Sequence, residues 1–542
     1  MSADSRRPLL LLAAAVFFFH ALVTGGHLMS PDEEIMYRTA ESLAMKGTFA
    51  ILPLEADMRT GLLMPGVQPD QTFLTKLGKN RDVFYAQYLP LQPVLTIPLV
   101  WLGKITEHVF AAPFARHTWP GMTTQYLSEL PPDEYASAAW RRGVVVMLFN
   151  PLIAALSAIA LARLARLLTG NRMAGIAAAA LWAFGTVAWP HSRTYFTEPL
   201  AGLFALLAFD ALCRWFLAPS ISLKYAVMIG VWLALANLTR VDSPIFTVGV
   251  IGAMVALGVF RVVRHDTWAR EGKSWPVVEI FVAGAIALAA WIALQSFNTM
   301  RFGHDITAGY GDQSEGVKFD TPLVIGIHGF LFSPGKGAFF FSPALLIGLW
   351  GWRRIPRNSR WVALAAIISF MPFFLAMSAW QNWAGGWCWG PRHIVQLHLP
   401  FMLGAAFLFA MPLSHIARIA VSTIAAIGVS VQVYGSSQSP LDYYREYYMT
   451  FRDLEYSRVN VDAFQAQMIT NDFVFARRGD NGQSDGDVSP TQFPAPLQNS
   501  LYQPQDTQWA AYATMWKFGY CDWYLWNLFR SGKNPDRWSD AP

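Results

Sequence analysis

The chain has 542 residues, of which 54% are hydrophobic and only 14% are charged, against about 25% charged residues in an average soluble domain. This composition excludes an ordinary soluble enzyme, and the 14% of aromatic residues excludes disordered and coiled-coil proteins. The net charge of +5 is not concentrated in a basic run beside stacking aromatic residues, so we expect no nucleic-acid partner.

Apolar stretches long enough to cross the hydrocarbon of a membrane recur along the chain. We count roughly eleven of the length that about 30 Å of hydrocarbon requires, and they begin near residues 9, 143, 173, 199, 225, 244, 276, 338, 361, 394 and 417. The first, preceded by Arg6 and Arg7, also has the pattern of a cleavable signal peptide, but no A-x-A cleavage site follows it. We therefore predict an all-α polytopic membrane protein.

Basic residues indicate how these spans are oriented. They recur at alternate connections, as Arg163, Arg166 and Arg172, then Arg214 and Lys224, then Arg261, Arg264, Arg270 and Lys273, then Arg353, Arg354, Arg357 and Arg360, and finally Arg418. The positive-inside rule makes these connections cytoplasmic. We therefore expect the remaining connections to face outward together, namely 30–140, 190–198, 238–243, 298–337, 380–393 and the tail from 436.

The first outward segment places three carboxylates directly after a span, in Ser30-Pro31-Asp32-Glu33-Glu34. Ser30 at the N-cap and Glu33 three residues later form a capping box with Pro31 at the first helical position, so we predict a helix that ends at Gly47. The capping box gives Glu33 a structural role and explains Asp32 less well. Outward carboxylates at the end of a span are also suited to general-base catalysis.

The next two outward turns are short and polar. Thr197 is placed to cap the following helix, with Glu198 and Pro199 in its first turn, so Glu198 is either structural or functional. In the second turn, Arg240 and Asp242 stand at a membrane boundary, where a neutral ion pair is the simplest interpretation.

Two later outward segments carry cations among Gly and Trp residues. Arg301 lies in the first, and Lys336 follows in Ser333-Pro334-Gly335-Lys336-Gly337, which lacks the spacing and the Ser/Thr of a P-loop. Such a lysine either presents its ammonium to an anion or forms a turn at lipid head groups. In 380–393 four Trp residues fit an interfacial aromatic belt, whereas Arg392 at the start of a span requires a counter-charge or an anion such as phosphate.

No metal signature stands out in the sequence. HExxH is absent, and His393 and His398 are not spaced as i,i+4 ligands. We expect no cofactor; a divalent cation held by Asp32, Glu33 and Glu198 is the alternative.

The tail is polar and ends in aromatic residues. We expect 436–542 to form a small extracytoplasmic region whose end, Trp523-Tyr524-Leu525-Trp526, packs on the membrane surface or on the rest of the protein rather than on a sugar. Cys388 and Cys521 fall on the same predicted side, but the three cysteines form no disulfide framework.

Taken in order, the outward motifs resemble those of the GT-C superfamily of integral-membrane glycosyltransferases, which use sugars linked to a polyprenyl phosphate. Protein O-mannosyltransferases, the lipid A aminoarabinose transferase and mycobacterial arabinofuranosyltransferases are members. The resemblance covers residues 1–435 and rests on Pro31-Asp32-Glu33, Tyr85 to Lys104, Tyr195 to Pro199, Leu238 to Arg240, Asn298 to Gly303, Ser333 to Gly337 and Gly386 to Arg392. It implies a GT-C fold with a catalytic domain over 1–435, juxtamembrane helices in the first extracytoplasmic loop, 30–140, and an extracytoplasmic C-terminal region, 436–542.

The resemblance also implies an activity: transfer of a sugar from a polyprenyl-phosphate donor to a glycan, lipid or protein acceptor of the cell envelope. The site would face the periplasm or exterior of a bacterial inner or plasma membrane. A carboxylate would activate the acceptor, with Asp32 as first choice, Glu198 as second and Glu33 beside them, and transfer would invert the anomeric carbon in one in-line displacement.

Cations would hold the donor phosphate. Aminoarabinose-type enzymes carry an arginine shortly after the acidic pair and a Lys-Pro pair in the juxtamembrane segment, where this chain has Ile35 and Leu89-Pro90. Phosphate binding then falls to other cations, in the order Arg392, Lys336, Arg240 and Arg301. Candidate sugar or acceptor ligands are His191, Tyr195 and His393, although such residues near an interface are more often packed and hydrogen-bonded.

A lipid or glycan transporter or flippase is the main alternative. It would carry ionisable residues in the middle of its spans or broken helices near the bilayer midplane. In this chain the charges lie mainly at the ends of loops.

Overall fold

The computed structural model describes residues 3–57, 60–63, 68, 72, 74–116, 127, 130–219, 222–263, 276–303, 319–385, 388–438 and 522–523. The elements of the N-terminal half are α1 Ala3–Leu22, α2 Pro31–Lys46, β1 Ala50–Ile51, β2 Thr75–Leu77, β3 Phe84–Ala86, α3 Leu91–Ala115, α5 Pro132–Thr169, α6 Arg172–Gly185, α7 Ala188–Ser192, α8 Glu198–Leu217, α9 Leu223–Asn237 and α10 Pro244–Val263. The remainder are α12 Val277–Phe302, α13 Leu323–Phe332, α14 Ala338–Phe341, α15 Leu345–Arg353, η2 Arg357–Ser359, α16 Arg360–Ala379, η3 Arg392–Leu397, α17 His398–Phe409 and α18 His415–Ser436.

The predicted all-α polytopic architecture is confirmed. Seven helices of the described part are long and apolar enough to cross a membrane: α3, α5, α8, α10, α12, α16 together with η2, and α18. Four shorter apolar helices, α1, α6, α9 and α13, accompany them. In the centre, α5 and α8 are mostly buried, whereas α12 and α18 direct most of their apolar side chains outward, as lipid-facing helices do.

Two predicted spans are not continuous helices. The stretch that begins near residue 338 is divided into α14 and α15, with Ser342 in a non-helical conformation between them. Pro343 follows Ser342, and a proline disfavours helical geometry in the residue before it. The stretch near 394 begins as the 3-10 helix η3 and continues as α17. A short apolar helix, α13, also lies inside the segment 298–337 that we predicted to be a loop.

The segment Tyr85 to Lys104, on which the resemblance rests in part, contains a strand and one long helix. Residues 84–86 form strand β3, and one helix of 25 residues, α3, follows with Pro98 and Pro113 inside it. The apolar sequence continues across both prolines, and α3 packs closely against α5. A Cβ atom on Gly103 would lie 3.0 Å from the Cα atom of Arg141, so the two backbones approach at a point where only a glycine fits.

Helix α2 begins and ends where the sequence predicts. The Ser30 hydroxyl accepts a hydrogen bond from the Glu33 N–H at 3.3 Å, and Gly47 ends the helix with φ of +67°, a conformation that glycine adopts easily. Glu34 then fastens the helix to α5, because both of its carboxylate oxygens accept hydrogen bonds from Arg142, at 2.6 and 2.9 Å.

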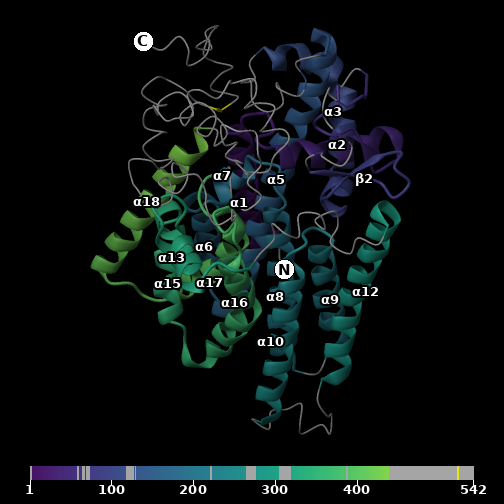
Figure 1. Ribbon diagram of the computed structural model, residues 1–542. Helices are drawn as coiled ribbons and strands as arrows, with labels where there is room; N and C mark the ends of the chain where they lie inside the picture. The colour runs from purple at the N-terminus through teal and green to yellow at the C-terminus, as the bar shows by residue number, and fades with distance from the viewer. Residues whose placement is uncertain are drawn as a thin grey trace.

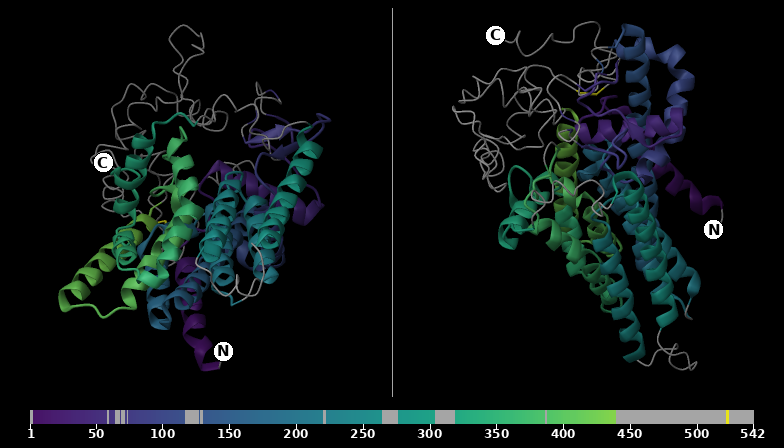
Figure 2. Two further views of the ribbon diagram at one scale, coloured as in Figure 1. Left: turned by 90° about the horizontal axis from the view of Figure 1, so that it is seen from below. Right: turned by 45° about the vertical axis from the view of Figure 1, so that its right-hand side comes forward.

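Described parts of several connections that we predicted to face outward lie at one end of the molecule. Figure 1 shows α2, the small sheet and α3 at one end, while α10 and α12 extend towards the other. The sheet has the order β1-β3-β2, and Arg301 at the end of α12 donates a hydrogen bond to the Ala86 carbonyl in β3. The N-terminal end of α1 projects from the bundle (Figure 2) and exposes Leu10 and Leu11.

Candidate active site

Four charged side chains from four distant segments form one ion-pair cluster. Asp32 is in the first turn of α2, Glu198 begins α8, Arg240 lies between α9 and α10, and Arg392 begins η3. The Arg392 Nε donates to Glu198 Oε1 at 2.7 Å, and its Nη2 donates to Asp32 Oδ2 at 3.0 Å. The Arg240 Nη1 lies 2.7 Å from the same Glu198 oxygen. Four of the connections that we predicted to face outward therefore meet here.

The side chains of the cluster differ in how far they are exposed. The Glu198 side chain is 0% exposed, Arg392 is 14% exposed and Asp32 is 25% exposed. Burial alone would lower the pKa of Arg392, but the carboxylates of Glu198 and Asp32 raise it well above its usual value, so Arg392 stays charged. Its guanidinium carbon also lies 3.7 Å from the centre of the Phe196 ring, which is a cation–π contact.

Arg240 is held by two carboxylates. Besides Glu198, it forms a bidentate pair with Asp242 at 2.6 and 2.9 Å, as the simplest interpretation of these two residues predicted. Its Nη1 also donates to the Thr197 hydroxyl at 3.1 Å. The predicted capping of α8 by Thr197 is wrong, because the Thr197 side chain caps no backbone N–H and is instead bound to Arg240.

Glu33 lies beside the cluster but in a different environment. It is fully buried, and its Oε2 accepts the Met29 N–H at 2.6 Å. Burial raises the pKa of Glu33 to about 7, in spite of hydrogen bonds from the backbone of Met29 and Tyr195 and the charge of Arg392. The Glu33 carboxylate therefore binds the N–H of the residue before the N-cap rather than that of Ser30, as a capping box would, and it is only partly ionised near neutral pH.

Lys336 is a second buried cation near Arg392. Its side chain is 2% exposed, and Nζ donates to the Cys388 carbonyl at 2.6 Å. Burial lowers the pKa of Lys336, and the charge of Arg392 lowers it further. The two cations repel each other, and an anion bound next to both would relieve this repulsion.

The two candidate histidines lie next to the cluster, and both are neutral. His191 Nε2 bonds the Trp389 carbonyl at 3.0 Å, and the ring of His393 lies 4.5 Å from that of Trp380. Burial lowers the pKa of His191 to about 4 and that of His393 well below its usual value. Both rings therefore offer neutral hydrogen-bonding groups.

Tyr195 and Arg301 are not brought into the cluster. The Tyr195 hydroxyl shares a buried 2.6 Å hydrogen bond with Thr96. Of the two roles considered for Tyr195, a packed residue or a ligand of the sugar or acceptor, this contact fits the packed residue. Arg301 donates to the Ala86 carbonyl and to Asn298, both at 2.8 Å, and stacks over Phe297 and Phe302. Its guanidinium therefore joins α12 to the sheet.

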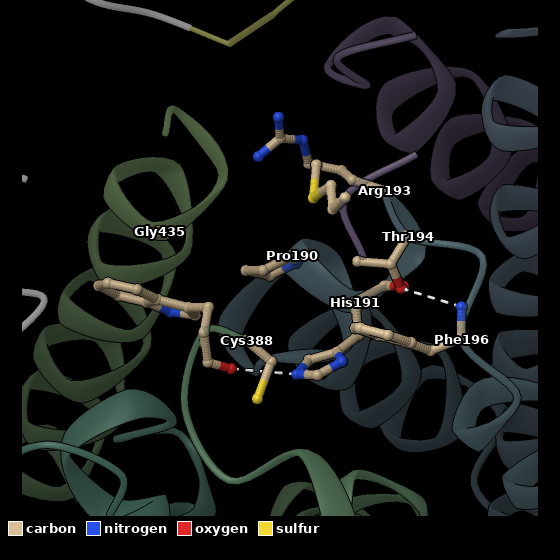
Figure 3. Close-up of a pocket in the computed structure, with 9 residues that line it drawn as sticks. Pro190, His191, Arg193, Thr194, Phe196, Cys388 and Gly435 are labelled. Carbon is tan, nitrogen blue, oxygen red and sulfur yellow. Dashed lines mark hydrogen bonds between the residues drawn. The ribbon is translucent and has the colours of Figure 1, made fainter. Parts of the chain in front are cut away.

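A small hollow, with room for about one water molecule, adjoins the cluster. Figure 3 shows Arg193 and Cys388 on opposite sides of it, with Pro190 and His191 between them. Phe196, which supports Arg392, also lines it, as does Gly435 at the end of α18. The hollow and the ion-pair cluster therefore share a wall.

Two residues that position the site were not identified from the sequence. Asn150 in α5 donates to the carbonyls of Thr194 and Phe196 at 2.6 and 3.0 Å, and Gln92 in α3 donates to the Tyr195 carbonyl at 2.6 Å. These amides fix the turn before Glu198. A single polar residue within an apolar helix was the only indication that the sequence offered.

Some predictions fall on residues outside the described part. They include most of the C-terminal region 436–542, with Cys521 and the Trp-rich end apart from Trp523, and the basic residues Arg264, Arg270 and Lys273. The indole of Trp523 donates to the Ser436 carbonyl at 2.7 Å, so this ring packs on the protein. Within the described residues, no group of three or more His, Cys, Asp or Glu side chains is placed to hold a metal ion.

No protein-family model matches the sequence, and no curated protein matches it. Several solved structures are similar to it, among them the following two. One is ArnT from Cupriavidus metallidurans bound to undecaprenyl phosphate, with a TM-score of 0.42 and 13% identity over 86% of this chain and 69% of that chain. The other is the archaeal oligosaccharyltransferase AglB from Archaeoglobus fulgidus in complex with an inhibitory peptide and a dolichol-phosphate, with a TM-score of 0.43 and 11% identity over 86% of this chain and 60% of that chain.

Proposed function

We propose that this protein is a membrane glycosyltransferase of the GT-C type. It moves a sugar from a polyprenyl-phosphate carrier to a cell-envelope glycan, lipid or protein on the outer side of a bacterial inner or plasma membrane. The observation that supports this most is the meeting of Asp32 with Arg392 at 3.0 Å, since it joins an acidic group of the first outward segment to a cation 360 positions later in the chain. We assign the chemistry to residues 1–435.

The donor phosphate is the first group that the proposed site must hold. When the sugar leaves, the phosphate gains negative charge, so catalysis requires cations that bind the leaving group more tightly than the donor. Arg392 uses Nε and Nη2 for Glu198 and Asp32, and Nη1 makes no hydrogen bond to any described residue. We assign the phosphate to this Nη1 group and to Lys336.

Asp32 is the proposed general base. It is the most exposed carboxylate of the cluster, and only Oδ2 is bonded to Arg392, so Oδ1 is left for an acceptor hydroxyl. Glu198 is fully buried, and one of its oxygens binds both Arg392 and Arg240. Its proposed role is therefore to orient the two guanidinium groups.

The test is a transfer assay with the full-length protein in lipid nanodiscs. Radiolabelled polyprenyl-phosphate sugars are supplied one at a time with a panel of envelope glycans, and products are separated by chromatography. We expect one donor to yield labelled glycan together with free polyprenyl phosphate. If instead a labelled lipid crosses the membrane of proteoliposomes with its sugar still attached, the transporter alternative holds.

A further inference from the structure

A carboxylate from the far end of the chain is buried beside the two segments that lead into the site. Asp522 is 3% exposed. Its Oδ1 lies 2.7 Å from His27 Nε2, and its Oδ2 lies 2.5 Å from Arg193 Nη2. His27 precedes Asp32 by five positions, and Arg193 precedes Glu198 by five positions. One side chain therefore bridges the segment before α2 and the segment before α8.

The surroundings are shaped to admit this carboxylate. A Cβ atom on Gly25 would lie 2.7 and 2.9 Å from the two oxygens of Asp522, so any larger residue would displace it. The Asp522 N–H donates to the Ser437 carbonyl at 2.7 Å. Because Trp523 also binds the end of α18 through Ser436, the carboxylate is held from its backbone as well as from its side chain.

The charge of Asp522 is needed where it lies. The Arg193 side chain is 1% exposed, and a buried guanidinium without a counter-charge is strongly unfavourable. Burial would raise the pKa of Asp522, but His27 and Arg193 lower it below its usual value, so the group is ionised at neutral pH. Removing the charge therefore leaves Arg193 uncompensated.

We propose that Asp522 is a positioning residue for the active site. By binding His27 and Arg193 together, it holds the start of α2 and the start of α8 in the arrangement in which Asp32 and Glu198 both reach Arg392. Met29 and Arg193 also line the hollow beside the cluster, and Figure 3 shows Arg193 at its edge, so the same bridge sets one of its walls. The effect on transfer rests on the proposed function; the effect on the two segments does not.

The first test measures the segments directly, by hydrogen exchange and mass spectrometry of the full chain in nanodiscs. In Asp522→Asn, we expect amides of residues 26–34 and 189–198 to exchange about tenfold faster, because local opening no longer breaks a buried ion pair. His27→Asn removes one arm and should speed exchange in 26–34 alone. The matched control is Asp210→Asn, which breaks a 2.7 Å pair with Arg214 near the other end of α8 and should leave both segments unchanged.

The second test measures transfer. We expect Asp522→Asn to lower kcat about tenfold with the donor KM changed by less than about threefold, since the catalytic groups remain but are misplaced. Asp522→Glu, which keeps the charge, should recover most of both readouts. If the Asp522→Asn protein does not fold, hydrogen exchange and kcat of Asp522→Glu and His27→Asn still test whether the bridge positions the two segments.

The outcomes separate the two proposals. Unchanged exchange in both segments of Asp522→Asn, or equal effects of His27→Asn on both segments, overturns the positioning role whatever the activity. Faster exchange in a protein that transfers no sugar from any donor leaves the bridge standing and removes the proposed function. Faster exchange with unchanged kcat shows that the bridge does not position the catalytic groups, and it also overturns the proposal.

Discussion

Asp32, Glu33 and Glu34 are consecutive in the sequence, yet the fold gives each a different role. Asp32 is the most exposed of the three and faces Arg392, Glu33 is buried as part of the helix cap, and Glu34 is buried between Arg142 and Arg38. Helical geometry explains the difference, because successive side chains point about 100° apart around the axis. The cap by Ser30 was predictable from the sequence, whereas the bond of Glu33 to the Met29 N–H and the partners of Asp32 and Glu34 were not.

Glu33 should make stability depend on pH. Its pKa is about 7 in the folded protein, against 4.5 for an ordinary solvated glutamate, so the folded state holds the proton more tightly. The contribution of Glu33 to the free energy of unfolding is therefore largest below pH 4.5. It falls by roughly 3 kcal/mol as pH rises towards 7. In Glu33→Gln, the thermal unfolding midpoint should fall less steeply over this range than in the wild type.

The matched control for Glu33 is Glu134→Gln, which changes an exposed carboxylate and should follow the wild type. Identical pH profiles for the Glu33→Gln variant and the wild type would show that Glu33 does not titrate in this range.

Arg392 is the cation on which the proposed site depends most. Arg392→Lys keeps the positive charge. It removes the planar guanidinium, which binds Asp32 and Glu198 and has a further N–H for a phosphate. We expect kcat/KM for the donor to fall about 100-fold, measured by transfer assay. Arg418→Lys, at the other end of α18 from the hollow, should have no effect. A loss smaller than about threefold would remove Arg392 from phosphate binding.

At the scale of elements, α2 is held rigidly enough to present Asp32. Glu34 binds Arg142 in α5 through both oxygens and also binds Arg38 at 2.9 Å, while Arg142 lies over the Tyr37 ring. The two arginines lower the pKa of Glu34 to about 2 against the opposing effect of burial. The stabilisation that the ionised Glu34 carboxylate provides is therefore present above pH 4.5 and is lost as pH falls towards 2.

Glu34→Gln should destabilise the protein, because it leaves two buried guanidinium groups with a neutral partner. We expect a loss of about 3 kcal/mol at pH 7, seen as a lower midpoint of thermal unfolding followed by tryptophan fluorescence. The loss should shrink as the wild type itself is acidified below pH 4.5. A midpoint equal to that of the wild type at pH 7 would show that the ion pairs contribute nothing to the attachment of α2.

The sequence predicted most helices, and its errors concern chain breaks. The apolar runs and the basic loops between them were sufficient to predict the long spans. The length of an apolar run determines whether it can cross the membrane, and the charge of its flanking loops determines its direction. Pro343 divides a predicted span, whereas Pro98 and Pro113 do not interrupt α3. A proline in a packed apolar helix can be tolerated when neighbouring helices satisfy the freed backbone groups, and neighbouring helices are not visible in a local pattern.

For the whole molecule, the sequence was sufficient to predict which connections lie on the same side. It was not sufficient to predict which of their charged side chains form ion pairs with one another. Basic loops placed Asp32, Glu198, Arg240 and Arg392 at one end, and the ion pairs confirm that they meet. Arg301 has a similar sequence context yet supports the sheet. Asp522 is one acid in an aromatic segment, and nothing in its spacing indicated His27 or Arg193 as partners.

The central claim is that Asp32 acts as a base opposite the phosphate-binding cations. The most direct test compares sugar transfer by the wild type, Asp32→Asn and the exposed-site control Asp133→Asn, with one donor in nanodiscs. We predict that Asp32→Asn lowers kcat by about 100-fold or more while binding of undecaprenyl phosphate changes by less than about threefold and Asp133→Asn matches the wild type. Transfer by Asp32→Asn within a few-fold of the wild type would contradict the claim.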